Sequence, residues 1–559
     1  MFKTKKLSLF SIVLIVLSFG TSLYFFNISL GHDWDYFDSL ALVKRSSLLN
    51  FGEFPLFDPF ICGGQSILAN PQSWLFSPFI LLTFLFPPIF SNLISWIICA
   101  VIGFLGAKRF FGKFLKTDAT IILCSFLFVN SSWIGLHLYA GHVPYRTFCF
   151  LPFLLSFILD RPSKKSYISI FALLSLFILD GGMYAFVFAF VWTMASFLFR
   201  QISFKEHMLF IKKNLLFIAA VMGSSVLIAS AKLFPSILEH HAREPILDSI
   251  IIRLPDLLKS FFSPFQRTMD PILKHVVNFH EIGCYLGVIG FSFFLYGLFR
   301  AKIPSKKNML WVGGLFLVIG TGIFKEGNPY SLLEFIPIVN NAHVQTRYLI
   351  IFYLYFLIFL GLGLEKFKWA DNKKFLFILV LMFESFFVRI YTSYSTYKKR
   401  PLENPYSVSI TRTTYKEMAQ KVKKPEIYFT DGINSLKCYE PAMREHKIYS
   451  SFDKEYYGVL ENENLDINHF SFSEINIENK TKMKQSSRFN MGYSEHFISS
   501  GEGAISQNDN GEFIVEVAPS TTLSVKYRPG FFNLLIFCYI LGILGLSILY
   551  FKFRNTENE

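Results

Sequence analysis

The 559-residue chain has too few charged residues for a soluble protein of its length. Only 17% of its residues are Asp, Glu, Lys or Arg, whereas 52% are hydrophobic and 18% are aromatic. Roughly 25% charged residues would be needed to cover a water-exposed surface, so another solvent must surround most of this chain. Its mean hydropathy is +0.41, and apolar runs of about 20 residues, the length that a bilayer requires, recur along it. We therefore expect a polytopic α-helical membrane protein.

Cysteine and the common catalytic motifs are also scarce. The seven cysteines offer neither a disulfide framework nor the paired spacing of a zinc site. Cys62 and Cys438 are the two that we expect outside the membrane, and a bridge between them stays open. The sequence has no P-loop, no GxGxxG after a strand, no HExxH and no GxSxG. It therefore gives no support to nucleotide hydrolysis or proteolysis.

The apolar runs predict about twelve transmembrane helices. The first run follows the basic start MFKTKK, but it is long for a signal peptide and no small-residue cleavage site precedes the next polar segment, so we expect it to be retained. The runs cover approximately residues 7–27, 89–107, 119–137, 147–159, 167–180, 183–199, 214–233, 282–299, 308–324, 346–364, 375–392 and 531–551.

Lys and Arg concentrate on one side of these helices. If the N-terminus is cytoplasmic, the cytoplasmic segments are MFKTKK, KRFFGKFLKTD, DRPSKK, RQISFKEHMLFIKK, RAKIPSKK, EKFKWADNKK and KFRNTENE, which together hold 24 Lys and Arg but 7 Asp and Glu. The positive-inside rule then places both termini in the cytoplasm. The net charge of +14 follows from this topology, so we expect the lipid bilayer as a partner and no nucleic acid.

The longest polar segments lie on the opposite, outer side. We expect a transmembrane domain over residues 1–392, with a long first outer loop over 28–88. Residues 393–530 contain EFIVEV and TTLSVKYRPG, whose alternation and β-branched content are typical of strands. They predict a small β-rich extracytoplasmic domain before a last helix and cytoplasmic tail, 531–559.

The first outer loop combines clustered acids with a short apolar stretch. GHDWDYFDS places Asp33, Asp35 and Asp38 directly after the first helix. In an extended backbone Asp33 and Asp35 would share a face, whereas in a helix they would diverge by roughly 200°. Asp38 is expected to be a solvated residue near a helix start. Ser77–Phe86 is apolar, too short to span and bounded by prolines, which predicts a helix lying in the membrane interface.

Several motifs, taken in order, resemble the YfhO-like bacterial membrane proteins, which are related to the GT-C superfamily of polyprenyl-phosphate-sugar glycosyltransferases. After GHDWDYFDS they are FPLFDPFICGGQSILANPQSWLFSPFILL, AGHVPYRTFCFLPFLLSFILD, DGGMYAFVFAF, HEIGCYLGVIGFSFFLYGLF, NAHVQTRYLIIFYLYFLIFLGLGLEKF and LSVKYRPGFF. The likeness covers nearly the whole chain. One departure is that the family usually has a proline between two arginines in the segment where this chain has NNAHVQTR, with Arg347 alone.

The resemblance implies a GT-C-like fold and an inverting sugar transfer on the outer face of the bacterial cytoplasmic membrane. The donor would be a lipid-linked sugar, on a polyprenyl phosphate, and the acceptor a surface polysaccharide, glycolipid or protein. Asp33 matches the position of the base, with Asp35 as its partner. A neighbouring carboxylate can raise the pKa of a base, or the two can hold a divalent cation such as Mg²⁺ or Mn²⁺ against the leaving phosphate.

Further polar residues at the expected outer ends of helices are candidates for substrate binding. They are His142, Arg146, Lys232, His280, Glu281 and Arg347.

Each of these candidates also has a structural alternative. The i,i+4 spacing of His142 and Arg146 would place both on one helical face, as sugar or phosphate ligands or as interfacial anchors. Glu281 could favour a helix dipole, and Lys232 could hold a lipid phosphate or reach to the interface. Within the eleventh helix, Glu384 and Arg389 are expected to neutralise each other.

Two other classes of function stay open. A transporter or flippase for lipid-linked sugars would place charges in mid-span and contain internal repeats, and a non-catalytic scaffold would bind cell-wall material. If the outer mouth of the bundle is one active site, Asp33, His142, Lys232, Glu281 and Arg347 should converge around a single cavity.

Overall fold

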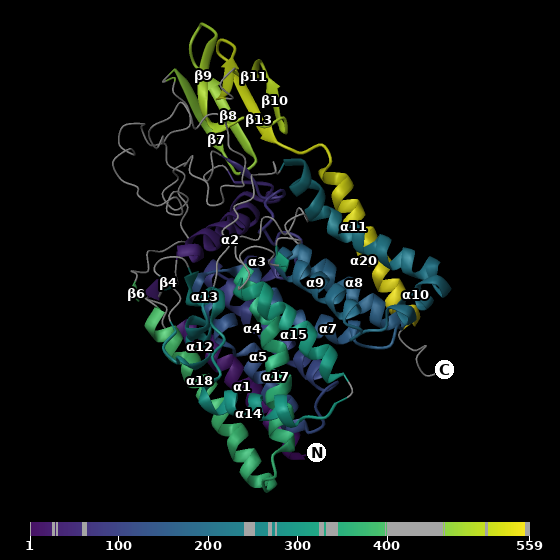
Figure 1. The fold of residues 1–559 in the computed structure, drawn as a ribbon. Helices are drawn as coiled ribbons and strands as arrows, with labels where there is room; N and C mark the ends of the chain where they lie inside the picture. The colour runs from purple at the N-terminus through teal and green to yellow at the C-terminus, as the bar shows by residue number, and fades with distance from the viewer. Residues whose placement is uncertain are drawn as a thin grey trace.

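The computed structural model describes residues 2–24, 28–29, 32–58, 64–239, 252–266, 271–273, 277–303, 305–322, 329–330, 345–396, 398–399, 462, 464–508 and 512–553. A large helical part and a smaller part made of β-strands follow one another along the long axis of the molecule (Figure 1). The cysteines Cys62 and Cys438, and any bridge between them, lie outside the described residues.

The helical part combines long helices with short ones at their ends. The long helices are α1 (Phe2–Tyr24), α2 (His32–Phe51), α4 (Pro88–Phe111), α5 (Asp118–Val129), α8 (Lys164–Leu179), α9 (Met183–Leu198), α11 (Leu215–Glu239), α14 (Gly287–Arg300), α15 (Lys306–Thr321), α17 (Leu349–Lys366), α18 (Asp371–Thr396) and α20 (Phe532–Phe553). The shorter ones are α3 (Ile80–Leu85), α6 (Ser132–Ala140), the 3-10 helix η1 (Val143–Phe150), α7 (Leu151–Ile158), α10 (Phe204–Lys213), α12 (Leu254–Phe262), α13 (Phe279–Ile282) and η2 (Gln345–Tyr348).

All twelve segments expected to be transmembrane are largely helical. Within the described residues, six helical segments are both long and apolar enough to cross a membrane, and the apolar helices Val143–Ile158 and Met183–Leu198 are shorter. The protein is therefore a mostly helical membrane protein. The six segments are Pro88–Phe111, Asp118–Ala140, Leu215–Leu238, Phe279–Arg300, Gln345–Lys366 and Phe532–Phe553.

The predicted third span is divided between α5 and α6 by a polar side chain. Asn130 accepts a hydrogen bond from Ser18 Oγ (2.8 Å) and donates one to Ser385 Oγ (3.0 Å). The side chain of Ser131 then caps α6, and Gly141 ends it with φ 89°, a left-handed conformation that glycine adopts without strain. The chain consequently turns between α6 and η1 at the end of the span.

Helix α17 forms the centre of the apolar core. Its residues from Leu349 to Leu364 are almost all buried, because α14, α15 and α5 pack around it. At Gly297 of α14 and Gly363 of α17 the two backbones touch, and a Cβ at either position would collide with a carbonyl oxygen of the other helix. Small residues at such crossings allow the close packing that holds helices together in lipid.

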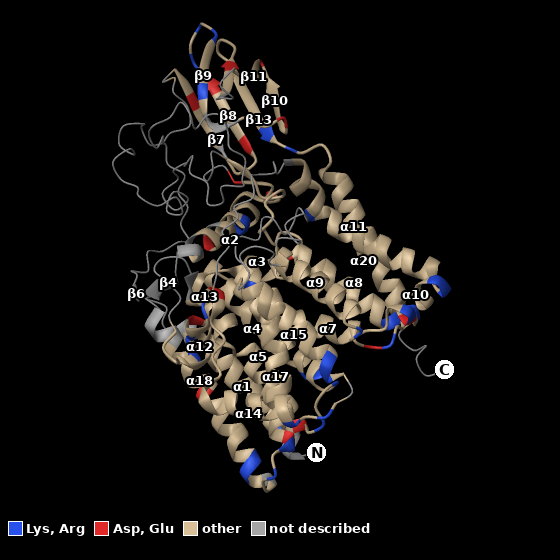
Figure 2. Ribbon diagram, viewed as in Figure 1, with Lys and Arg blue, Asp and Glu red and all other residues tan. Residues whose placement is uncertain are grey.

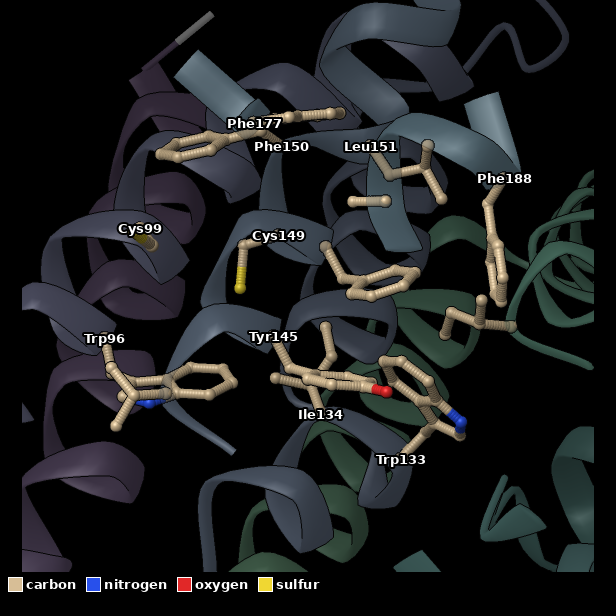
Figure 3. Packing of buried hydrophobic residues seen from close by; sticks show 14 of the residues in the cluster. Trp96, Cys99, Trp133, Ile134, Tyr145, Cys149, Phe150, Leu151, Phe177 and Phe188 are labelled. Atoms are coloured by element: carbon tan, nitrogen blue, oxygen red, sulfur yellow. The ribbon is translucent and has the colours of Figure 1, made fainter. Parts of the chain in front are cut away.

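Charged residues are scarce along the middle of the helical part. Lys and Arg gather at the helix ends farthest from the β-strands, where the N-terminus also lies (Figure 2). Packed rings and thiols fill the interior instead, and Figure 3 shows Trp133 and Tyr145 side by side, with ring centroids 5.9 Å apart, below Cys149. This distribution is the one expected of a bundle surrounded by lipid.

The predicted β-rich region near the C-terminus is confirmed. EFIVEV and TLSVKY form strands β12 and β13, as their alternation indicated. The strands make an antiparallel sheet in the order β10-β13-β8-β7 and a second in the order β11-β12-β9. They are β7 (Leu465–Phe470), β8 (Glu474–Asn479), β9 (Gln485–Gly492), β10 (Phe497–Gly501), β11 (Gly503–Gln507), β12 (Glu512–Val517) and β13 (Thr522–Tyr527).

Short strands of two or three residues lie outside these sheets. They pair as β1 (Ile28–Ser29) with β6 (Lys398–Lys399), and as β2 (Phe57–Asp58) with β3 (Gln65–Ser66). A third pair joins β4 (Pro271–Leu273) to β5 (Val277–Asn278).

The first loop joins the two parts of the molecule. The ring of Phe57 stacks on Tyr527 of β13 with centroids 4.5 Å apart, and Glu53 accepts a hydrogen bond from Ser471 Oγ (2.6 Å). Within the predicted interfacial segment Ser77–Phe86, only Ile80–Leu85 is helical, as α3. Six residues are too few to span a bilayer, and the place of this helix in the membrane interface stays a prediction.

Candidate functional site

Two clusters of polar side chains involve residues of α2 and α13, and α2 lies at the end of the helical part that faces the β-strands (Figure 1). η1 contacts both, because Tyr145 touches the first and Arg146 belongs to the second. The first is built mainly from side chains at helix ends and turns, whereas Lys44 and Lys232 of the second lie inside α2 and α11.

The first, called the histidine cluster, consists of His137, His142, His280, Glu281 and Arg347. The Nδ1 atoms of His137 and His142 are 2.7 Å apart, so one ring must donate a proton and the other accept it. The ring of His280 lies edge-on to both, with centroid distances of 5.7 and 5.3 Å. Its Nε2 is 3.3 Å from Glu281 Oε1. The three imidazoles and the carboxylate therefore lie next to one another.

Arg347 fixes the carboxylate of this cluster. Its Nε donates to Glu281 Oε2 and its Nη2 donates to Oε1, each over 2.7 Å. The guanidinium carbon also lies 5.3 Å from the ring centroids of Tyr145 and Tyr184. A two-point ion pair of this kind, with two aromatic rings beside the guanidinium, keeps Glu281 charged and both of its oxygens engaged.

The acids of the first loop begin a helix that packs next to this cluster. Trp34 Nε1 donates to the carbonyl oxygen of Leu138 (2.8 Å), the residue after His137. Asp33 and Asp35 lie in the first turn of α2, so the extended alternative was wrong and their backbone positions differ by roughly 200° around the helix axis. The side chains of both acids lie outside the described residues.

Asp38 differs from its prediction. Its side chain is half-buried and accepts a hydrogen bond from Asn92 Nδ2 (2.8 Å). Asp38 therefore links α2 to α4, and the prediction of a solvated residue was wrong.

The second, called the lysine cluster, consists of Lys44, Arg146, Asp180 and Lys232, all buried. Arg146 Nε and Nη2 donate to the two oxygens of Asp180 over 2.7 and 2.6 Å, and its Nη1 donates to Ser95 Oγ (2.6 Å). The Lys232 ammonium donates to the backbone carbonyls of Asn70 (2.5 Å) and of Ser73. The cluster thus holds three basic groups and one acidic group.

The ring of Trp74 lies next to two of the basic groups. Lys44 Nζ is 3.5 Å from the centroid of its ring, and the guanidinium carbon of Arg146 is 5.4 Å from it. The indole is fixed because its Nε1 donates to Thr83 Oγ1 (3.2 Å). Burial lowers the pKa of Lys44 well below its usual range, and the positive charges of Lys232 and Arg146 lower this pKa further.

The predicted convergence on one site was wrong for Lys232, and the predicted site residues are divided between two places. His142, His280, Glu281 and Arg347 come together, whereas Arg146 and Lys232 belong to the lysine cluster. The expected helical face shared by His142 and Arg146 was wrong. His142 precedes η1, and in a 3-10 helix with about three residues per turn the i and i+4 positions diverge by about 120°.

The predicted neutralisation of Glu384 by Arg389 was also wrong. Glu384 accepts a hydrogen bond from the Tyr285 hydroxyl (2.7 Å). Arg389 donates to the Ser131 carbonyl (3.1 Å), and its guanidinium carbon is 4.4 Å from the centroid of Phe19.

Three residues of these clusters were missed in the sequence. His137 had a signal, because SWIGLHLYAGHVPYR places a second histidine one turn before a glycine that ends the helix. Lys44 had no such signal, because LVKRSS contains only an ordinary pair of adjacent basic residues. Asp180 lies at the end of α8, and its partner Arg146 could be assigned only from the packing.

The described residues contain no group of three or more His, Cys, Asp or Glu side chains that could hold a metal ion. The predicted ligands of a divalent cation, Asp33 and Asp35, have side chains outside that part of the chain. Comparison of the sequence and structure with protein-family models, with curated proteins and with solved structures gave no match.

Proposed function

We propose that this membrane protein is a GT-C-like inverting glycosyltransferase with about twelve transmembrane helices and both termini in the cytoplasm. It transfers a sugar from a polyprenyl-phosphate donor to a polysaccharide, glycolipid or protein at the outer face of the bacterial cytoplasmic membrane. The proposal combines the resemblance to YfhO-like proteins with the geometry of the histidine cluster.

The observation that carries the proposal is the meeting of four residues chosen from the sequence. His142, His280, Glu281 and Arg347 come from segments far apart in the chain and lie within one cluster. The first turn of α2, with Asp33, is held beside α6 by Trp34. Carboxylate, imidazole and guanidinium groups at one end of a helical bundle are suited to binding sugar hydroxyls and an anionic leaving group.

The proposed reaction includes one proton transfer, from the acceptor hydroxyl to a carboxylate of the protein. The acceptor hydroxyl oxygen attacks the anomeric carbon, and the bond between that carbon and the phosphate oxygen breaks. The polyprenyl phosphate leaves with the electron pair, and the acceptor proton passes to a carboxylate within hydrogen-bond reach. Because attack and departure occur on opposite faces of the sugar, the anomeric configuration inverts.

Asp33 is the proposed base because the other nearby carboxylate is occupied. Both oxygens of Glu281 accept hydrogen bonds from Arg347, which disfavours proton uptake by Glu281. Glu281 and the imidazoles instead bind and orient sugar hydroxyls. Asp35 lies roughly 200° from Asp33 around the axis of α2, so only one of the two acids can face the reacting atoms, and the helix disfavours a divalent cation held between them.

The test is an assay of transfer by the purified full chain. The protein is incubated with a panel of polyprenyl-phosphate sugars, and released polyprenyl phosphate is measured. Asp33→Asn keeps the size of the side chain and removes its charge, so we expect the rate to fall about 10²–10⁴-fold. Asp256→Asn, which changes another acid in the first turn of a helix, is the matched control and should leave the rate unchanged.

Two results would contradict the proposal. If no donor in the panel releases polyprenyl phosphate, the proposed transferase activity is refuted. If Asp33→Asn and Asp35→Asn both keep full activity, the acids of the first loop take no part in the reaction. Loss of activity in Asp35→Asn alone would move the role of base to Asp35.

A further inference from the structure

The lysine cluster contains more basic than acidic side chains in a buried place. The charge of Arg146 is offset by Asp180. Lys232 donates to neutral carbonyl oxygens, which satisfy its hydrogen bonds without compensating its charge. Lys44 Nζ has no hydrogen-bond partner among the described residues, although it is fully buried.

Such an arrangement is costly when it stands alone. Transfer of an ammonium group from water to a protein interior costs several kcal/mol unless an anion and hydrogen bonds compensate it. The ring of Trp74, 3.5 Å from Lys44 Nζ, offsets only part of the cost of burying this ammonium group, because a cation–π contact contributes about 0.5–2 kcal/mol. An anion with several oxygen acceptors would supply both the missing charge and the missing hydrogen bonds.

We propose that Lys44 and Lys232 bind the phosphate group of a prenyl phosphate, with Trp74 as one wall of the site. Two ammonium groups match the two negative charges of a phosphate monoester, and its oxygens accept from Lys44 Nζ and from the third ammonium hydrogen of Lys232. The identity of the lipid as substrate or product rests on the proposed function, whereas the site itself rests on the lysine cluster.

The surroundings favour a lipid over free phosphate. Helix α3 follows Trp74 closely in the chain and exposes Leu81 (61%) and Leu85 (70%). Beyond Lys232, the end of α11 exposes Ile237 (73%). Exposed apolar side chains beside a buried cationic group provide contacts for a hydrocarbon chain and its phosphate at the same time.

The test measures binding to the full chain in detergent micelles. Farnesyl phosphate is the probe, and farnesol and inorganic phosphate are the comparison ligands, each followed by the shift of the thermal unfolding midpoint. We expect farnesyl phosphate to raise the midpoint and farnesol to leave it unchanged. An equal shift with inorganic phosphate at the same concentration would overturn the assignment to a lipid, and no shift with farnesyl phosphate would overturn the site.

A variant locates the binding. Lys44→Met removes the charge and keeps an apolar side chain of similar length, so folding should be retained, and the affinity for farnesyl phosphate should fall at least about tenfold. Lys164→Met is the matched control, because Lys164 also lies over a ring, 4.2 Å from the centroid of Phe553, but outside the lysine cluster. Unchanged affinity in Lys44→Met would overturn the proposal.

A measurement on the unaltered chain covers the case in which Lys44→Met does not fold. Farnesyl phosphate with a photoreactive group is cross-linked to the protein, and the labelled peptides are identified. Labelling of α2 or residues 64–79 supports the site, and labelling elsewhere overturns it. Binding of farnesyl phosphate without sugar transfer would refute the proposed function and leave this site intact. Sugar transfer together with an unchanged affinity of Lys44→Met for farnesyl phosphate would refute this site and leave the proposed function intact.

Discussion

The buried ion pair between Arg146 and Asp180 offers a direct test of the energetics of the helical part. Asp180→Asn keeps the volume of the side chain and one acceptor oxygen, but it removes the only acidic group of the lysine cluster. Arg146 is 1% exposed and Asp180 is 0% exposed, so no water replaces the lost charge. Removing one partner of a buried pair costs about 3–5 kcal/mol, and we expect a loss of this size in the free energy of unfolding.

The matched control is the same substitution in an exposed pair. Asp160 contacts Arg109, which is 43% exposed, and Lys113. Exposed pairs contribute about 0–1 kcal/mol, so Asp160→Asn should have a small effect. Both variants are measured by reversible unfolding of the full chain in detergent with increasing SDS. If both variants lose less than about 1 kcal/mol of unfolding free energy, the buried ion pair is refuted. The assignment of Asp180 to Arg146, which leaves Lys44 without an acidic partner, is then refuted as well.

Further predictions concern topology and helix packing. Cysteines introduced at the exposed Lys480 and at Lys307 should react with an impermeant reagent outside the cell at the first position only, and reaction at the second alone would reverse the proposed orientation. Gly297→Ala should destabilise the protein by about 1–3 kcal/mol, because the new Cβ would collide with a backbone carbonyl of α17. Gly314→Ala, where a Cβ would meet nothing within 4 Å, should instead stabilise α15 by about 0.5–1 kcal/mol, and unfolding in SDS would distinguish the two signs.

The amino-acid sequence by itself determined the elements. Apolar runs of bilayer length became helices, because backbone groups in lipid must be satisfied within the segment itself. The alternation in EFIVEV and TLSVKY produced strands, since one face of each pairs with a buried layer. His280 and Glu281 could be selected because polar residues at the start of an apolar run are costly without a role.

Tertiary structure decided which of these residues meet. His142 and Arg146 are four residues apart, but the segment between them forms a 3-10 helix. His142 therefore lies in the histidine cluster, whereas Arg146 pairs with Asp180. The partners of Lys44 come from segments that no local pattern relates to α2. Hydrophobic periodicity specifies which face of a helix is buried, but the pairing of buried charges depends on how several helices pack together, and that information is not local.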